Sequence, residues 1–106
     1  MKRLYELLSG NQPSYLTPLF WTHGEDEQVM RHMIGQMHEN GIGEFVVESR
    51  PHPDFLGDQW WSDVDIILDE AKKRGMKVWF FDDRKFPSGF AAGVIRDKYP
   101  QYLKIY

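Results

Sequence analysis

The chain contains 106 residues, of which 13 are basic and 16 acidic, so its formal net charge is −3, and it contains no cysteine. This length supports a single core, so residues 1–106 are treated as one domain, and the lack of cysteine excludes disulfides and thiolate metal sites. A mildly acidic chain without a long apolar run or an evident secretory signal predicts no nucleic-acid partner, no membrane partner and a cytoplasmic location.

Two short elements are predicted before residue 25. Leu4, Leu7 and Leu8 occur at helical spacing, which predicts a short helix within Met1–Gly10, followed by a turn at residues 10–13. The compact and mostly apolar run Tyr15–Trp21 predicts the first strand.

Two amphipathic helices alternate with two further strands in the middle of the chain. Glu25–Asn40 and Asp58–Arg74 place apolar side chains at helical spacing, and each is followed by a glycine, a common stop signal. Phe45–Val47 is short and continuously apolar, which is typical of a strand covered on both faces. Met76–Phe81 is apolar almost throughout and predicts the third strand.

The last predicted elements are a helix over Gly89–Lys98, ended by Pro100, and a short strand over Gln101–Tyr106. The order β-α-β-α-β-α predicts an α/β fold with a parallel three-stranded sheet, because helices are the usual connections between parallel strands. An open doubly wound sheet and part of a (β/α)8 barrel both fit this order.

Polar side chains gather at the predicted carboxyl ends of the strands, where ligands bind in both architectures. Neighbouring parallel strands lie about 4.8 Å apart, so Glu48 and an aspartate of the third strand can supply an acid/base pair or hold sugar hydroxyls. Side chains alternate across a sheet, so only one of Asp82 and Asp83 is expected to face the site. The alternative is a set of solvated loop charges with a Glu48–Arg50 ion pair. The candidate binding residues are Trp21, His23, Glu48, Arg50, His52, Trp60, Asp82 and Asp83.

Histidine and tryptophan side chains contribute to this candidate site. His23 and His52 fall in the first two strand-end loops, but no ligand pair has a helical metal-binding spacing, so no metal is expected. One of Trp60 and Trp61 is expected to pack in the core and the other to offer a flat platform to a sugar ring, for which Trp21 is a similar candidate. No glycine-rich phosphate loop follows a strand, which argues against a phosphate-binding domain, and no cofactor is predicted.

Four segments carry motifs in common with a known group of enzymes: Pro18–Trp21, Glu48–Pro51, Asp69–Trp79, and Asp82-Asp83 with Phe86–Gly93. Together they resemble the opening of glycoside hydrolases of the α-L-rhamnosidase type. The resemblance implies a (β/α)8 barrel that cleaves glycosidic bonds with carboxylates, and hence a carbohydrate partner. A full barrel takes roughly 250 residues, so this chain is expected to supply three of its eight βα units. The resemblance places the main acid and base on later strands, which implies an N-terminal barrel fragment that contributes part of a sugar-binding site and is inactive alone.

A three-stranded piece of a barrel leaves two sheet edges open and one face without its inner neighbours. Phe45, Val47, Trp79 and Phe81 cannot all be covered by three helices. Unpaired edges and uncovered aromatic side chains favour association, so we expect a homo-oligomer formed through the open sheet edges. The alternative function is a non-enzymatic remnant or a self-assembling α/β module.

Overall fold

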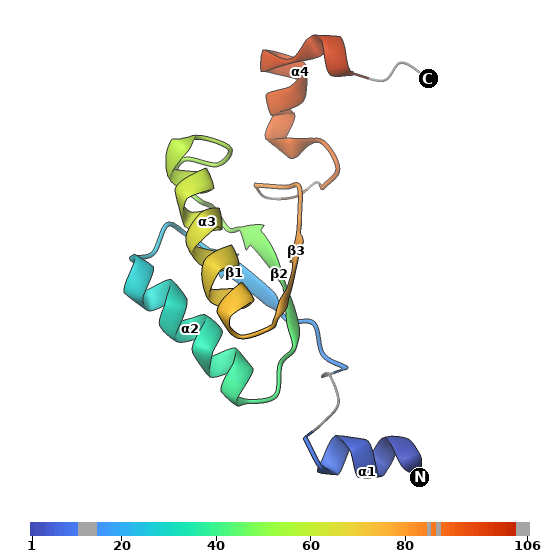
Figure 1. The fold of residues 1–106 in the computed structure, drawn as a ribbon. Helices are drawn as coiled ribbons and strands as arrows, with labels where there is room; N and C mark the ends of the chain where they lie inside the picture. The colour runs from blue at the N-terminus through green and yellow to red at the C-terminus, as the bar shows by residue number, and fades with distance from the viewer. Residues whose placement is uncertain (11–14, 85, 87, 104–106) are drawn as a thin grey trace.

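The computed structural model describes residues 1–10, 15–84, 86 and 88–103. Its centre is a parallel sheet with the strand order β1-β2-β3, formed by Leu19–Thr22, Glu44–Ser49 and Lys77–Phe80 (Figure 1). Helix α2 (Glu27–Glu39) connects β1 to β2, and helix α3 (Asp58–Lys73) connects β2 to β3. The predicted α/β fold with a three-stranded parallel sheet is confirmed.

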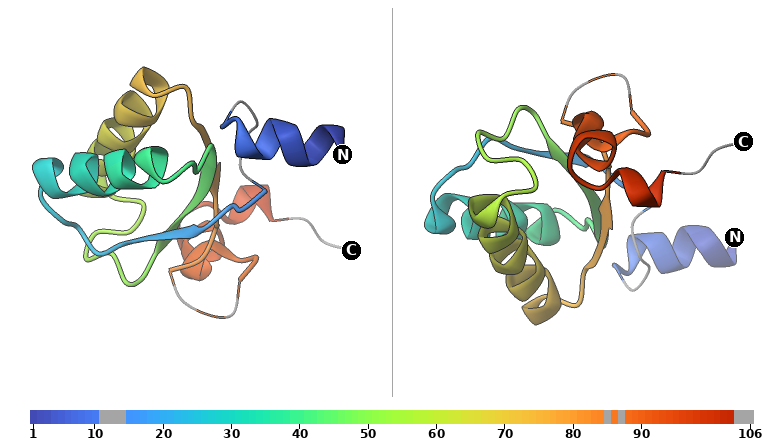
Figure 2. Two further views of the ribbon diagram at one scale, coloured as in Figure 1. Left: turned by 90° about the horizontal axis from the view of Figure 1, so that it is seen from below. Right: turned by 90° about the horizontal axis from the view of Figure 1, so that it is seen from above.

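Both connecting helices lie against the same face of the sheet (Figure 2). On this face Phe20 of β1 and Phe45 and Val47 of β2 are buried, and the rings of Phe20 and Phe45 lie 5.6 Å apart. They pack against the apolar stripes of the helices, in which Ile34 of α2 and Ile67 of α3 are fully buried. This helix-covered face therefore forms the hydrophobic core, and removal of its apolar surface from water stabilises the fold.

The opposite face of the sheet has no helix packed against it in the described part of the chain. Its side chains alternate with the core residues, and Trp21, Trp79 and Phe81 are 50%, 57% and 39% exposed. The prediction that β2 is covered on both faces is therefore wrong, since Val46 on this side is only half-buried. We call this surface the bare face; its residues are Leu19, Trp21, Glu44, Val46, Glu48, Lys77, Trp79 and Phe81.

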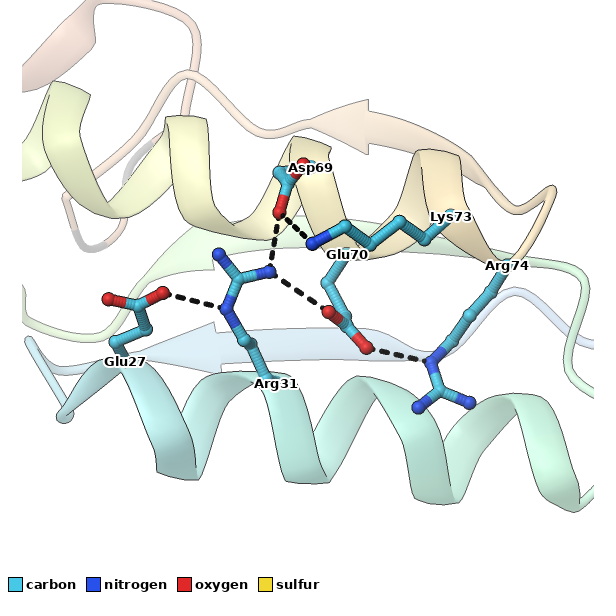
Figure 3. Close-up of polar contacts among 6 residues, drawn as sticks. All are labelled: Glu27, Arg31, Asp69, Glu70, Lys73 and Arg74. Carbon is cyan, nitrogen blue, oxygen red and sulfur yellow. Dashed lines mark hydrogen bonds and ion pairs between the residues drawn. The ribbon is translucent and has the colours of Figure 1, made fainter.

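A network of ion pairs joins α2 to α3 at their solvent side (Figure 3). Arg31 of α2 donates to Asp69 and Glu70 of α3 at 2.6 Å and 2.9 Å, and also to Glu27 one turn earlier on its own helix. Hydrogen bonds to Asp69, Glu27 and Glu70 raise the pKa of Arg31. Arg74 binds the second oxygen of Glu70, so that one carboxylate holds two guanidinium groups.

The two ends of the chain extend beyond this layered centre. Helix α1 (Lys2–Leu8) lies past one end of the sheet, and helix α4 (Val94–Lys98) lies past the other (Figure 1). The radius of gyration of 16.5 Å reflects this, because a compact domain of about 100 residues has a value near 13 Å. The sequence predicts α1 correctly, whereas residues 11–13 of the predicted turn lie outside the described residues.

The predicted boundaries of the longer elements agree with the structure to within a few residues, except in the first strand. Tyr15 lies before β1 rather than in it, because the strand begins at Leu19. Helices α2 and α3 end at Glu39 and Lys73, one residue before the predicted ends, and each is followed by a turn that includes the predicted glycine.

The predictions for the end of the chain are largely wrong. The predicted helix Gly89–Lys98 is an α-helix only over α4, because Ala91, Ala92 and Gly93 have φ values of 48°, 54° and 77° and form a separate short turn. A left-handed conformation costs a non-glycine residue about 1 to 2 kcal/mol. In place of the predicted strand Gln101–Tyr106, residues Pro100–Tyr102 form a 3-10 turn, and residues 104–106 lie outside the described residues.

Candidate functional site

The strand register brings several of the predicted site residues to one end of the bare face. Trp21 pairs in register with Glu48, and the ladder continues because the N–H of Arg50 donates to the carbonyl of Thr22. Phe81 extends β3 in the same way by donating to Val47. Because side chains alternate along a strand, Trp21, Glu48, Arg50 and Phe81 belong to the same face, at the carboxyl ends of the strands.

The centre of this end is a contact between a tryptophan, a buried glutamate and an arginine. The indole N–H of Trp21 donates to Oε2 of Glu48 at 2.9 Å, and Nη2 of Arg50 lies 3.3 Å from Oε1 of the same carboxylate. Glu48 is 2% exposed, and its two oxygens contact Trp21 of β1 and Arg50, which follows β2. The predicted proximity of Trp21, Glu48 and Arg50 is present, and so is the Glu48–Arg50 ion pair of the alternative interpretation.

Arg50 is also flanked by two aromatic rings. Its guanidinium carbon lies 5.5 Å from the ring centre of Trp21 and 4.7 Å from that of Phe86. These distances are within the range of cation–π attraction. Phe86 comes from the loop after β3, and no sequence periodicity indicates that it lies over Arg50, so its role in this site was not predicted. We call Trp21, Glu48, Arg50 and Phe86 the rim cluster.

A second tryptophan–glutamate pair lies at the other end of the bare face. The indole N–H of Trp79 donates to Oε2 of Glu44 at 3.1 Å, and the hydroxyl of Thr17 donates to Oε1 at 3.1 Å. The hydrogen bonds from Trp79 and then Thr17 lower the pKa of Glu44. Glu44 and Glu48 are four residues apart in β2, so their side chains lie on the same face of the sheet. This spacing is the sequence signal for the second tryptophan–glutamate pair.

The two aspartates after β3 differ in burial. Asp83 is fully buried, and its Oδ2 accepts a hydrogen bond from the hydroxyl of Ser88 at 3.0 Å. Its Oδ1 has no hydrogen-bond partner among the described residues. Asp82 is exposed and accepts from the backbone N–H of Gly89 at 2.9 Å. Both carboxylates are therefore bonded to residues that come a few positions later in the chain, Ser88 and Gly89.

His23 lies in the loop after β1 but forms its described contacts with a neighbour in sequence. Its Nδ1 lies 2.9 Å from Glu25, and its backbone N–H donates to the same carboxylate at 2.9 Å. Burial alone would raise the pKa of Glu25, but the backbone N–H groups of His23 and Glu25 and the His23 ring together lower it. The ring of His23 is half-exposed, which keeps it accessible at the edge of β1.

His52 is not part of an accessible site, which corrects the prediction for this residue. It is fully buried, and its Nε2 lies 2.8 Å from Oδ2 of Asp63 on α3. The backbone N–H of Asp54 donates to Nδ1, so the ring proton resides on Nε2 and is donated to Asp63. The amide of Gln59 donates to the other oxygen of Asp63. These bonds anchor the β2–α3 loop to the start of α3.

Trp60 is also buried, which corrects its assignment to the binding surface. Its ring packs edge-on against His52 and Phe55, with centroid separations of 5.2 Å and 5.0 Å. Trp61 is the exposed member of the pair. The prediction that one of these two tryptophans packs in the core is confirmed, and Trp60 is the one that does so.

Comparison of the chain with known protein families, with curated proteins and with solved structures finds no match. Among the described residues, no three histidine or carboxylate side chains converge on a position that could hold a metal ion. None of the helices in the described ranges has the length and apolar character needed to cross a membrane.

Proposed function

We propose that the rim cluster, at the carboxyl-terminal end of the bare face, forms part of a carbohydrate-binding site and that the chain is the N-terminal part of a glycoside hydrolase-like (β/α)8 barrel. The rim cluster is the observation that supports this most strongly. It combines an exposed indole, a carboxylate and a guanidinium at the carboxyl ends of parallel strands, where barrel enzymes bind their ligands.

The chemistry of the rim cluster suits a sugar ring. An indole offers a flat apolar surface to the C–H groups of a sugar, and the hydrogen bond to Glu48 fixes the orientation of Trp21 before a ligand arrives. Half of the Trp21 side chain is exposed for such a contact. Arg50 stands beside this ring as a donor for hydroxyl or carboxylate groups, and the buried carboxylate of Glu48 holds both the indole and the guanidinium in place.

The same contacts favour binding rather than hydrolysis by this chain alone. Glu48 is already engaged by Trp21 and Arg50, and Asp82 and Asp83 are bonded to Gly89 and Ser88. A glycoside hydrolase needs one carboxyl group as a general acid and another as base or nucleophile. The proposed role of these residues is therefore to position the sugar, with the reacting carboxyl groups on later strands of a complete barrel.

Titration with rhamnose-containing and uronic oligosaccharides, followed by calorimetry and tryptophan fluorescence, tests this proposal. We expect binding by the unaltered chain and at least about a tenfold loss of affinity in Glu48→Gln, which corresponds to about 1.4 kcal/mol. Glu44→Gln is the matched control, since it removes the same charge from the same face of β2 and also accepts from an indole. Its affinity should equal that of the unaltered chain.

Two outcomes would contradict the proposal. If the folded chain binds neither type of oligosaccharide, the non-enzymatic alternative is supported instead. If Glu44→Gln weakens binding as much as Glu48→Gln, the ligand does not select the rim cluster over the rest of the bare face. Circular dichroism and the unfolding midpoint of each variant separate loss of binding from loss of fold.

A further inference from the structure

The β1 edge of the sheet presents backbone groups that face away from β2. The carbonyls of Pro18 and Thr22 accept hydrogen bonds from β2, and in a parallel ladder consecutive residues point alternately to the two sides. The N–H and C=O groups of Leu19 and Trp21 therefore point outward. Beside them, on the side of α2, lies an apolar hollow of about 670 Å³; its lining includes Phe20, Met33, Met37 and Ile42.

The β3 edge has the same construction. The N–H groups of Lys77 and Phe81 donate to Gly43, just before β2, and to Val47 of β2, so the N–H and C=O groups of Val78 and Phe80 point outward. An apolar hollow of about 380 Å³ lies beside this edge on the side of α3; its lining includes Trp61, Val64, Leu68 and Phe80. Phe80 is half-exposed although it lies on the helix-covered face, because α3 covers only part of β3.

From these two edges we infer that the chain associates with a second copy of itself, the β3 edge of one copy pairing in parallel with the β1 edge of the next. All three strands run in the same direction and both helices cover the same face. Parallel addition of β1 after β3 thus continues the sheet and keeps the helices on one side. This pairing also brings the hollow beside β3 of one copy next to the hollow beside β1 of the other, along the line where the two copies meet, which we call the seam. In the joined sheet, β1 of the second copy takes the position that a fourth strand has in a barrel.

The side chains at this seam are complementary. Leu19 and Trp21 of one copy lie beside Trp79 and Phe81 of the other on the bare face, which covers apolar surface that is exposed in the single chain. Beyond the carboxyl ends of the strands, the exposed Asp82 follows β3 and the half-exposed imidazole of His23 follows β1, so both polar side chains lie at the same end of the seam. Pairing of β1 with β1 about a two-fold axis lacks this match, because the strands would run antiparallel and place like residues together.

The sharpest test blocks one edge at a time and then mixes the products. Leu19→Lys places a charge at the β1 edge, and Phe80→Lys places one in the hollow beside β3. Both positions are half-exposed, so a lysine there leaves the core intact, and lysine is a common means of preventing edge pairing. Sedimentation velocity at high micromolar concentration should show association of the unaltered chain and monomers for each variant alone. An equimolar mixture should form a dimer, because each variant retains the edge that the other lacks.

The control is Tyr5→Lys, which alters an exposed aromatic residue of α1 away from both edges and should associate like the unaltered chain. A monomeric unaltered chain at these concentrations would overturn the inference. If Phe80→Lys associates with itself, the β1 edges of two copies pair with each other instead. If the equimolar mixture of the two variants contains only monomers, pairing of β3 with β1 is excluded. None of these readings depends on sugar binding, so this inference and the proposed function can fail separately.

Discussion

The helix-covered face and the bare face are built from alternate residues of the same strands, yet their surroundings differ sharply. On the helix-covered face, Phe45 and Val47 are fully buried under α2 and α3. On the bare face, Trp79 of the adjacent strand is more than half exposed and its indole N–H is held by Glu44. Apolar packing dominates the first surface, whereas exposed aromatic rings fixed by carboxylates dominate the second.

This difference assigns separate roles to the two faces. Burial of apolar area is the main source of folding stability, so substitutions on the helix-covered face should act chiefly on stability. Exposed aromatic residues contribute little to folding but are strong contact surfaces. Substitutions on the bare face should therefore act chiefly on binding or association.

The largest effect is expected from Phe45→Ala. This change removes a fully buried ring and leaves a cavity under both helices, so it should lower the free energy of unfolding by about 3 to 5 kcal/mol. Trp79→Ala on the bare face is the comparison, and it should lower the free energy of unfolding by less than about 1 kcal/mol. Urea denaturation followed by circular dichroism measures both values, and Phe45→Leu gives a smaller loss if Phe45→Ala does not fold. Equal losses for Phe45→Ala and Trp79→Ala would remove the distinction between the two faces.

An intermediate effect is expected at the buried His52–Asp63 pair. Asp63→Ala leaves the N–H of His52 without its acceptor in the buried loop and should cost about 3 kcal/mol, measured by the same denaturation. Asp63→Asn keeps an oxygen that can accept this bond, so a smaller loss is expected. Asp65→Ala, which alters an exposed aspartate two residues further along α3, is the matched control. If Asp65→Ala lowers the free energy of unfolding as much as Asp63→Ala does, the buried His52–Asp63 pair contributes no more to stability than an exposed aspartate.

Much of the helix-covered face could be predicted from the sequence, because hydrophobic periodicity is a local signal. The spacing of Met30 and Ile34 on α2 and of Val64 and Ile67 on α3 indicates which side of each helix is buried. The parallel sheet follows from the alternation of these helices with short apolar strands.

The site was predicted less well, because burial depends on contacts between segments that are distant in sequence. Nothing local distinguishes His23, which is half-exposed, from His52, which is buried and bonded to Asp63, eleven residues later in α3. The positions of Phe86 and the left-handed turn at Ala91 and Ala92 likewise follow from loop geometry rather than from a periodic pattern. Alternation predicts that Asp82 and Asp83 have different surroundings but does not indicate that Asp83 is the buried one.

The smallest effect on stability is expected at the surface network between α2 and α3. Hydrogen bonds from Lys73 and then Arg31 lower the pKa of Asp69, and those from Arg31 and then Arg74 lower the pKa of Glu70. A carboxyl group with a lowered pKa in the folded state stabilises the fold above its unfolded pKa, and this contribution is lost as the pH falls through the folded value. The loss should therefore begin below the ordinary values of 3.8 and 4.5 for these two groups.

Replacement of Arg31 by methionine tests whether this acid sensitivity comes from the network. Arg31→Met removes the cation shared by both carboxylates, so the decrease in stability between neutral pH and about pH 3 should be smaller than in the unaltered chain. Arg96→Met is the control, because Arg96 pairs only with its exposed neighbour Asp97 among the described residues and joins no two helices of the layer. Urea denaturation at both pH values measures the difference. Equal acid sensitivity in Arg31→Met and the unaltered chain would mean that other carboxyl groups cause it, and that apolar packing alone holds α2 against α3.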